Sequence, residues 1–155
     1  MRVNSKDVYE WIEHKLGKKD PIVGERICPF AKKTVETKTI QVVHGVRDLG
    51  PQIDHCCDLF DTLALECVVI YIQYKISEAR LSQICGRGHK QNPNYAVMYD
   101  HPSNNGLHRG VSFSFGKCPL VFIQPLKELK EAQGKLRKTA YYDNWGMTHD
   151  DDMFY

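Results

Sequence analysis

The loop "DHPSNNGLHRG" (100–110) brings two imidazoles and a guanidinium together in one short polar stretch. His101 precedes Pro102, which biases the histidine toward an extended backbone at the end of a strand, a common position for a metal ligand or a catalytic group. Arg109 can hold a carboxylate or a propionate in a two-pronged contact. With His108, these residue types are those of a metal centre or of a site for an anionic ligand. The alternative is a solvated hairpin loop, because the intervening asparagines and glycine are ordinary turn residues.

A second candidate is Cys28, in the segment "ICPFAKK" (27–33). If the residues after Pro29 form a helix, Lys32 and Lys33 lie within one turn of it. Nearby ammonium groups and a helix N-terminus both favour the thiolate form of a cysteine. A thiolate can act as a nucleophile or as an iron ligand. The alternative is that Cys28 packs as a small hydrophobic residue while the lysines point to water.

The glycine-containing segment "CGRGHKQN" (85–92) is a weaker candidate. It lacks both the G-x-x-x-x-G-K-[ST] and the G-x-G-x-x-G spacing of phosphate-binding loops. We therefore expect Gly86 and Gly88 to end a helix and form a turn. Arg87 and His89 could still line a pocket there.

Two patterns bear on metal binding elsewhere in the chain. The six cysteines contain no C-x-x-C pair, which disfavours a structural zinc site. In the C-terminal tail, His149 and the aspartates at 150–152 offer oxygen donors, but a solvated run of charge is the favoured interpretation.

Composition limits the classes of protein to consider. The chain has 155 residues, of which 42% are apolar and 26% charged, with a net charge of +2. This length suits one domain covering residues 1–155. The charge is too small to predict a nucleic-acid partner, and no apolar run is long enough to span a membrane. Because the start "MRVNSKDVYEW" lacks the apolar core of a signal peptide, we expect a cytoplasmic protein without disulfides.

Periodicity and turn residues predict a mixed series of helices and strands. The predicted helices cover 5–16, a segment from 51 onward, 77 to about 84, and 126–138. The predicted strands cover 38–43, 67–74, 95–99, 110–115 and 119–124. The unbroken apolar run at 67–74 is typical of a central strand covered on both faces. Together these elements predict an α+β fold, with helices packed on one mixed sheet of about five strands. The residues after 138 show no clear periodicity.

The order of the motifs resembles the YqcI/YcgG family. The chain has an early "CPFAK", an apolar strand, "HPS" with an arginine a few residues on, then "PLVFIQPLKELKEAQ" and a closing "YYDNWG". Some members of that family are haem-dependent oxygenases that hydroxylate a nitrogen of amino acids such as arginine. The opening "WIE" and "CPFAK" are also similar to an uncharacterised bacterial domain family with an "LCPFAK" motif, which implies no activity.

The resemblance implies a small haem-binding monooxygenase that acts on an amine or amino acid. It would assign the axial iron position to His101, with Cys28 as the second choice. Arg109 would neutralise a propionate, His108 would hydrogen-bond bound dioxygen, and Arg87 would be a further contact to the cofactor. A wall for the haem could come from the apolar residues Phe113, Phe115, Val121 and Phe122, which are otherwise ordinary core.

Two functions from other classes remain open. One is a non-enzymatic interaction or regulatory domain, with Cys28 buried and the loop at 100–110 as a partner surface. The other is a thiol enzyme with Cys28 as nucleophile and a histidine as base. In each case we expect no nucleic acid and no membrane, while self-association into a homo-oligomer is compatible with the sequence.

Overall fold

A four-stranded mixed sheet forms the centre of the molecule. The computed structural model describes residues 2–104 and 106–147. The strand order is β1 (Ile40–His44), β2 (Cys67–Tyr71), β6 (Leu120–Pro125) and β3 (Tyr95–Asp100). β1 and β2 pair in parallel, whereas β6 is antiparallel to both of its neighbours, so β3 runs in the same direction as β1 and β2. The predicted α+β class with a mixed sheet is confirmed.

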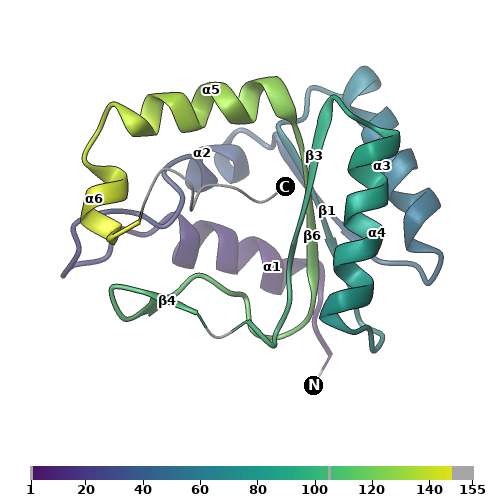
Figure 1. The fold of residues 1–155 in the computed structure, drawn as a ribbon, viewed down its shortest axis with the longest axis horizontal. Coiled ribbons are helices and arrows are strands. Elements are labelled where there is room, and N and C mark those ends of the chain that lie inside the picture. Colours follow the sequence, from purple (N-terminus) through teal and green to yellow (C-terminus); the bar gives the residue numbers. More distant parts are fainter. Residues whose placement is uncertain (1, 105, 148–155) are drawn as a thin grey trace.

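Helices cover both faces of this sheet. In Figure 1, α3 (Leu49–Thr62) and α4 (Glu78–Gln91) lie on one side of the strands. On the other side lie α1 (Ser5–Trp11), a π-helical turn η1 (Ile12–Leu16) and α2 (Ala31–Glu36). α5 (Leu126–Arg137) follows β6 and leads to a short helix, α6 (Tyr141–Trp145). None of the helices in the described ranges is long and apolar enough to cross a bilayer.

The two faces of β2 belong to separate apolar cores, as expected for a central strand. Val68 and Ile70 pack with α3 and α4, whereas Val69 and Tyr71 pack with α1 and α2. All five residues of β2 are buried. Because successive side chains of a strand point to opposite faces, this apolar run supplies both cores at once.

The edge strand β1 has its outer backbone groups covered by side chains. The Val42 N–H donates to the Tyr9 hydroxyl at 3.2 Å. The Gln52 amide nitrogen donates to the His44 carbonyl at 2.8 Å, and its amide oxygen accepts from the Val46 N–H at 2.9 Å. Residues from α1 and α3 therefore cover part of the outer edge of this strand.

The predicted loop at 85–92 is wrong, because α4 continues through both glycines to Gln91. A Cβ on Gly88 would stand 2.9 Å from the Cγ2 atom of Ile53 in α3. Glycine therefore lets the two helices approach closely, which offsets its cost of about 1 kcal/mol in a helix interior. The predicted start is confirmed, since the Ser77 hydroxyl accepts from the Arg80 N–H at 3.1 Å and caps the helix.

The predicted strand at 110–115 is also shorter than expected. Only Val111–Ser112 form a strand, β5, which pairs with β4 (Leu107–His108) in a separate hairpin. Its turn residues, Arg109 and Gly110, have φ values of 52° and 77°. Two such residues at the centre of a hairpin match the tight turns that fit the twist of paired strands.

Sequence analysis missed α6, whose five residues are too few to show a periodicity. The helix packs an aromatic cluster against the loop before α2. The indole nitrogen of Trp145 donates to the Arg26 carbonyl at 3.0 Å, and the Tyr141 hydroxyl donates to the Ile27 carbonyl. Gly146 ends the helix in the left-handed region with a φ of 70°.

Candidate functional site

His101 lies at the end of β3, as predicted, but both of its ring nitrogens are engaged. Nε2 lies 2.8 Å from the Ile76 carbonyl, so it carries the ring proton and donates it. Nδ1 accepts from the Ser103 N–H at 3.1 Å and lies 2.8 Å from the Ser103 hydroxyl. The ring thus joins the loop before α4 to the loop after β3. Binding a metal through either nitrogen would require one of these contacts to break.

The same contacts extend to the first turn of α4. The Ser103 hydroxyl lies 3.0 Å from one carboxylate oxygen of Glu78, and the Tyr99 hydroxyl lies 3.4 Å from the other. His101 is therefore part of a polar network that fixes two loops at one end of the sheet. That is a structural role.

His108 and Arg109 lie on the β4–β5 hairpin and face α6. The His108 ring packs on Phe113 with 4.7 Å between centroids, and Phe113 meets Trp145 edge-on at 4.9 Å. The Arg109 guanidinium contacts the Asp143 carbonyl at 3.4 Å, at the C-terminal end of α6 where a cation is favoured. The described residues show no hydrogen bond or ring contact between His101 and either of these side chains, so the expected cluster does not assemble.

Cys28 is a half-buried residue just before α2, and its thiol group is turned into the protein. Burial raises its pKa, and the backbone N–H groups of Phe30 and Ala31 lower it by a smaller amount. The net direction is opposite to the one expected from the neighbouring lysines, because Lys33 is exposed and Lys32 pairs with Glu36 at 3.8 Å. The neutral thiol is favoured, which weakens the case for a nucleophile or a thiolate ligand.

The segment around Arg87 is helical, so the expected pocket-lining loop is absent at 85–91. Arg87 is exposed on α4. His89 lies half-buried with its Nδ1 atom 2.6 Å from the Tyr95 carbonyl, which ties α4 to β3. Both side chains lie on a packed helix rather than around a cavity.

The aromatic residues proposed as a haem wall do not form one surface. Phe115 and Phe122 pack with Trp11 in the core on the α1 side of the sheet, at centroid distances of 5.3 and 6.3 Å. Val121 belongs to the core under α3 and α4, and Phe113 belongs to the cluster around α6. The alternation along the chain sends them to three different cores.

No cluster of three or more metal-ligating side chains occurs among residues 2–104 and 106–147. The tail residues His149 and 150–152 lie outside the described residues.

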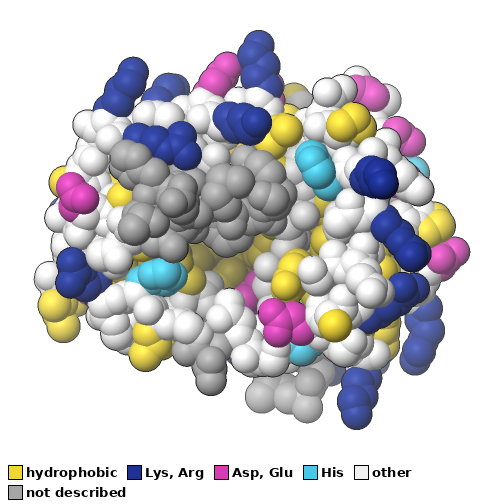
Figure 2. Space-filling view, in the orientation of Figure 1, with side chains coloured by type: hydrophobic (Ala, Val, Ile, Leu, Met, Phe, Trp, Pro, Cys, Tyr) yellow, Lys and Arg dark blue, Asp and Glu magenta, His cyan; other side chains and the backbone are white. Residues whose placement is uncertain are grey.

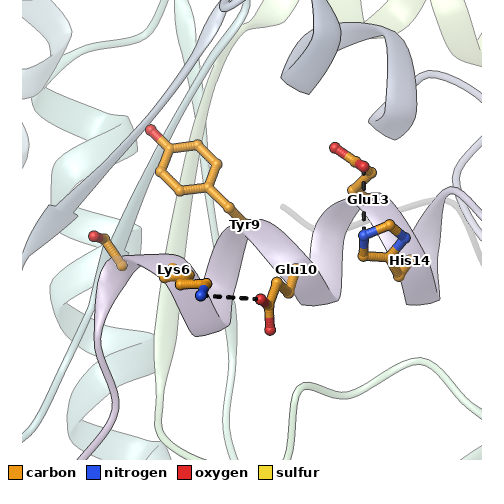
Figure 3. A pocket seen from close by; sticks show the side chains of 6 residues that line it. Lys6, Tyr9, Glu10, Glu13 and His14 are labelled. Carbon is orange, nitrogen blue, oxygen red and sulfur yellow. Dashed lines mark ion pairs between the residues drawn. The ribbon is translucent and has the colours of Figure 1, made fainter.

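A shallow cleft with a volume of about 370 Å³ runs along α1 and η1. On the face drawn in Figure 2, Lys, Arg, Asp and Glu side chains are scattered around the margin of the molecule. The charged side chains of the cleft pair with one another, Lys6 with Glu10 at 3.9 Å and His14 with Glu13 at 3.4 Å. In Figure 3 these pairs project from successive turns, while Tyr9 points away toward the sheet. The cleft thus presents charges that already have partners.

The second cleft has a volume of about 270 Å³ and lies at the carboxyl ends of β1 and β2. Its described lining consists of Arg2, Val3, Asn4, His44, Tyr71 and Gln73. Ligands of open α/β sheets bind beyond the carboxyl ends of the strands. Arg2 is the one fully charged side chain in this lining, and no carboxylate is among these six residues.

Hydrogen-bond donors dominate the second cleft. The Asn4 amide oxygen accepts from the Asp7 N–H, which leaves the donating end of the amide available. His44 meets Tyr71 edge-on at 5.1 Å, so an imidazole and a phenol lie side by side. Arg2 is exposed, and none of the ion pairs found among the described residues includes it. A cleft with a guanidinium, an imidazole, a phenol and an amide favours a negatively charged ligand.

Sequence analysis missed this group because its members come from three distant segments of the chain. The parallel register sets His44 opposite Tyr71, and the side chain of Gln73 then reaches the segment around Val3. The available signal was the pair of strands predicted at 38–43 and 67–74, although the second strand ends at Tyr71 rather than at residue 74.

No family model, curated protein or solved structure matches the chain. The resemblance to the YqcI/YcgG family therefore stays a prediction.

Proposed function

We propose that this chain is a ligand-binding domain that holds a small anion, a carboxylate or a phosphate, in the cleft at the carboxyl ends of β1 and β2. The observation that carries the proposal is the donor-rich lining, with Arg2 and no carboxylate. The proposal belongs to the regulatory-domain class that the sequence left open.

The chemistry of the lining limits the ligand. The Arg2 guanidinium can bind two oxygens of one carboxylate or phosphate at once. His44 and the Asn4 amide can supply further donors. A volume of about 270 Å³ falls just below the roughly 300–1,000 Å³ of pockets for drug-sized ligands, so the ligand is a small molecule. The carboxylate end of an amino acid meets these requirements.

Calorimetric titration with inorganic phosphate and with succinate tests the proposal. We expect saturable binding that weakens as ionic strength rises, because salt screens exposed charges. Arg2→Gln should lower the affinity about tenfold or more, since a hydrogen bond to a charged group contributes roughly 1.5–3 kcal/mol. The matched control is Lys6→Gln, which removes a cation from the first cleft and should leave the affinity unchanged. Equal losses in both variants, or no saturable binding of either anion, would overturn the proposal.

A haem-dependent oxygenase is a second candidate, supported by the order of the "CPFAK" and "HPS" motifs. In the present arrangement His101 and Arg109 do not fit a haem, because both bond to protein groups. Iron binding at Nε2 would require the ring to release the Ile76 carbonyl. Hemin titration of the purified protein tests this candidate. A Soret band that shifts in His101→Ala, but not in the exposed control His14→Ala, would support it, whereas an unchanged hemin spectrum would remove it.

A cytoplasmic location is part of the proposal. All six cysteines are free thiols, and a reducing compartment keeps thiols in this state. Imaging of the tagged protein in cells tests it, and accumulation in an oxidising compartment would contradict it.

A further inference from the structure

We infer that Gln73 is a positioning residue that holds the N-terminal segment in place and so presents Arg2 to the bound anion. The inference rests on the proposed function. The Val3 N–H donates to the Gln73 amide oxygen at 3.0 Å, and the Gln73 amide nitrogen donates to the Val3 carbonyl. One side-chain amide therefore satisfies both backbone groups of Val3, as a neighbouring strand would.

The flanking contacts show why this clamp controls Arg2. Val3 is only 6% exposed and packs in the core on the α1 side of the sheet. Asn4 caps α1, and its backbone N–H donates to the Asp7 carboxylate at 3.0 Å. Arg2 lies directly before these two anchored residues and lines the cleft with Gln73. The direction in which the chain leaves Val3 therefore decides where the guanidinium lies.

The physical benefit of such a clamp is preorganisation. An arginine on an unanchored segment loses backbone and side-chain freedom when it binds a ligand, and this loss weakens binding. The Gln73 amide removes most of the backbone part of that loss before the ligand arrives. Disrupting the clamp should thus weaken anion binding mainly through Arg2.

A double-mutant cycle separates this role from direct contact with the ligand. Phosphate and succinate affinities are measured for the wild type, Arg2→Gln, Gln73→Met and the double variant. We expect each single variant to lose about tenfold, and the double variant to lose no more than either alone, because both remove the same contact. The control Gln124→Met makes the same change on β6, outside the cleft lining, and should leave the affinity unchanged.

Hydrogen exchange supplies a second readout that a general loss of stability would not reproduce. The Val3 amide should be protected in the wild type and should exchange rapidly in Gln73→Met, while amides of β2 keep their protection. If the two substitutions reduce affinity additively, to about a hundredfold, or if Gln73→Met binds like the wild type, the positioning role is overturned while the anion site stands. If the wild type binds neither anion, both proposals fall.

Discussion

Two regions of this molecule combine histidine with arginine, and they use these side chains in opposite ways. At the loop after β3, His101 bonds to the Ile76 carbonyl and Arg109 bonds to the end of α6. At the carboxyl ends of β1 and β2, His44 and Arg2 line a cleft, and none of the ion pairs found among the described residues includes Arg2. The comparison teaches that the presence of histidine and arginine is not enough to indicate a binding site. Their hydrogen-bond donors must also be free of partners within the protein.

The largest expected effect is a loss of stability from a substitution in the aromatic cluster around α6, which Arg109 contacts. Trp145→Ala removes a fully buried indole that packs on Phe113 and bonds to the Arg26 carbonyl. We expect a loss of about 3–5 kcal/mol in the free energy of unfolding, measured by urea denaturation. Phosphate affinity under native conditions should not change. If the folded Trp145→Ala variant bound phosphate with a changed affinity, the cluster around α6 and the cleft would not be independent.

The next largest effect is expected when a carboxylate is introduced into the cleft at the carboxyl ends of β1 and β2, so that its charges pair with one another as in the cleft along α1. His44→Glu places a carboxylate beside Arg2, where it pairs with the guanidinium and repels an anion. We expect the phosphate affinity to fall about a hundredfold, equivalent to about 2.7 kcal/mol. Because His44 is exposed, the free energy of unfolding should stay within about 0.5 kcal/mol of the wild type. Unchanged affinity would show that His44 and Arg2 do not share a ligand.

His101→Ala should give the reverse pattern. It leaves the Ile76 carbonyl and the Ser103 N–H without their partner, and an unsatisfied polar group costs about 1–3 kcal/mol. We expect a loss of that size in chemical denaturation, with unchanged phosphate affinity. An unchanged midpoint would show that the network around His101 contributes nothing to stability.

Cys28 is likewise a candidate nucleophile from its residue type alone, but its surroundings disfavour the reactive form. Burial raises its pKa, so below that pKa the reactive thiolate is a minor form. At pH 8 we expect iodoacetamide to label Cys28 more slowly than a free thiol of ordinary pKa. The rate should rise as the pH increases above 9. Mass spectrometry of the labelled peptide measures it, and rapid labelling near neutral pH would restore the thiol-enzyme hypothesis.

Arg109→Ala should have the smallest effect. The guanidinium is exposed, and its contact with the Asp143 carbonyl is long, so we expect a loss of about 0.3–1 kcal/mol in the free energy of unfolding. Thermal unfolding at low and high salt measures it. A loss of several kcal/mol would mean that the hairpin depends on this arginine rather than on Phe113.

Much of the fold follows from local pattern. The apolar run at 67–74 predicted the central strand, and Ser77 predicted the start of α4 correctly. The prediction that Gly86 and Gly88 end the helix was wrong, because the contact between Gly88 and Ile53 depends on tertiary packing that no local pattern shows. α6 was missed for a related reason, since its five residues are held by contacts with distant parts of the chain.

The site was harder to predict than the fold. The sequence favoured His101, His108 and Arg109 because they are neighbours in the chain, but each is used by a different structural contact. Arg2 and His44 are far apart in the sequence but line the same cleft, where the Gln73 amide bonds to Val3 beside Arg2. Proximity of this kind is a property of topology, which residue spacing alone does not encode.

The covering of β1 has a consequence for how molecules of this protein meet one another. An edge strand with open amide and carbonyl groups invites a strand from another molecule and can start a growing intermolecular sheet. Here the Tyr9 hydroxyl and the Gln52 amide already bond to two of these groups, the Val42 N–H and the His44 carbonyl. A strand that adds to this edge would have to displace both side chains.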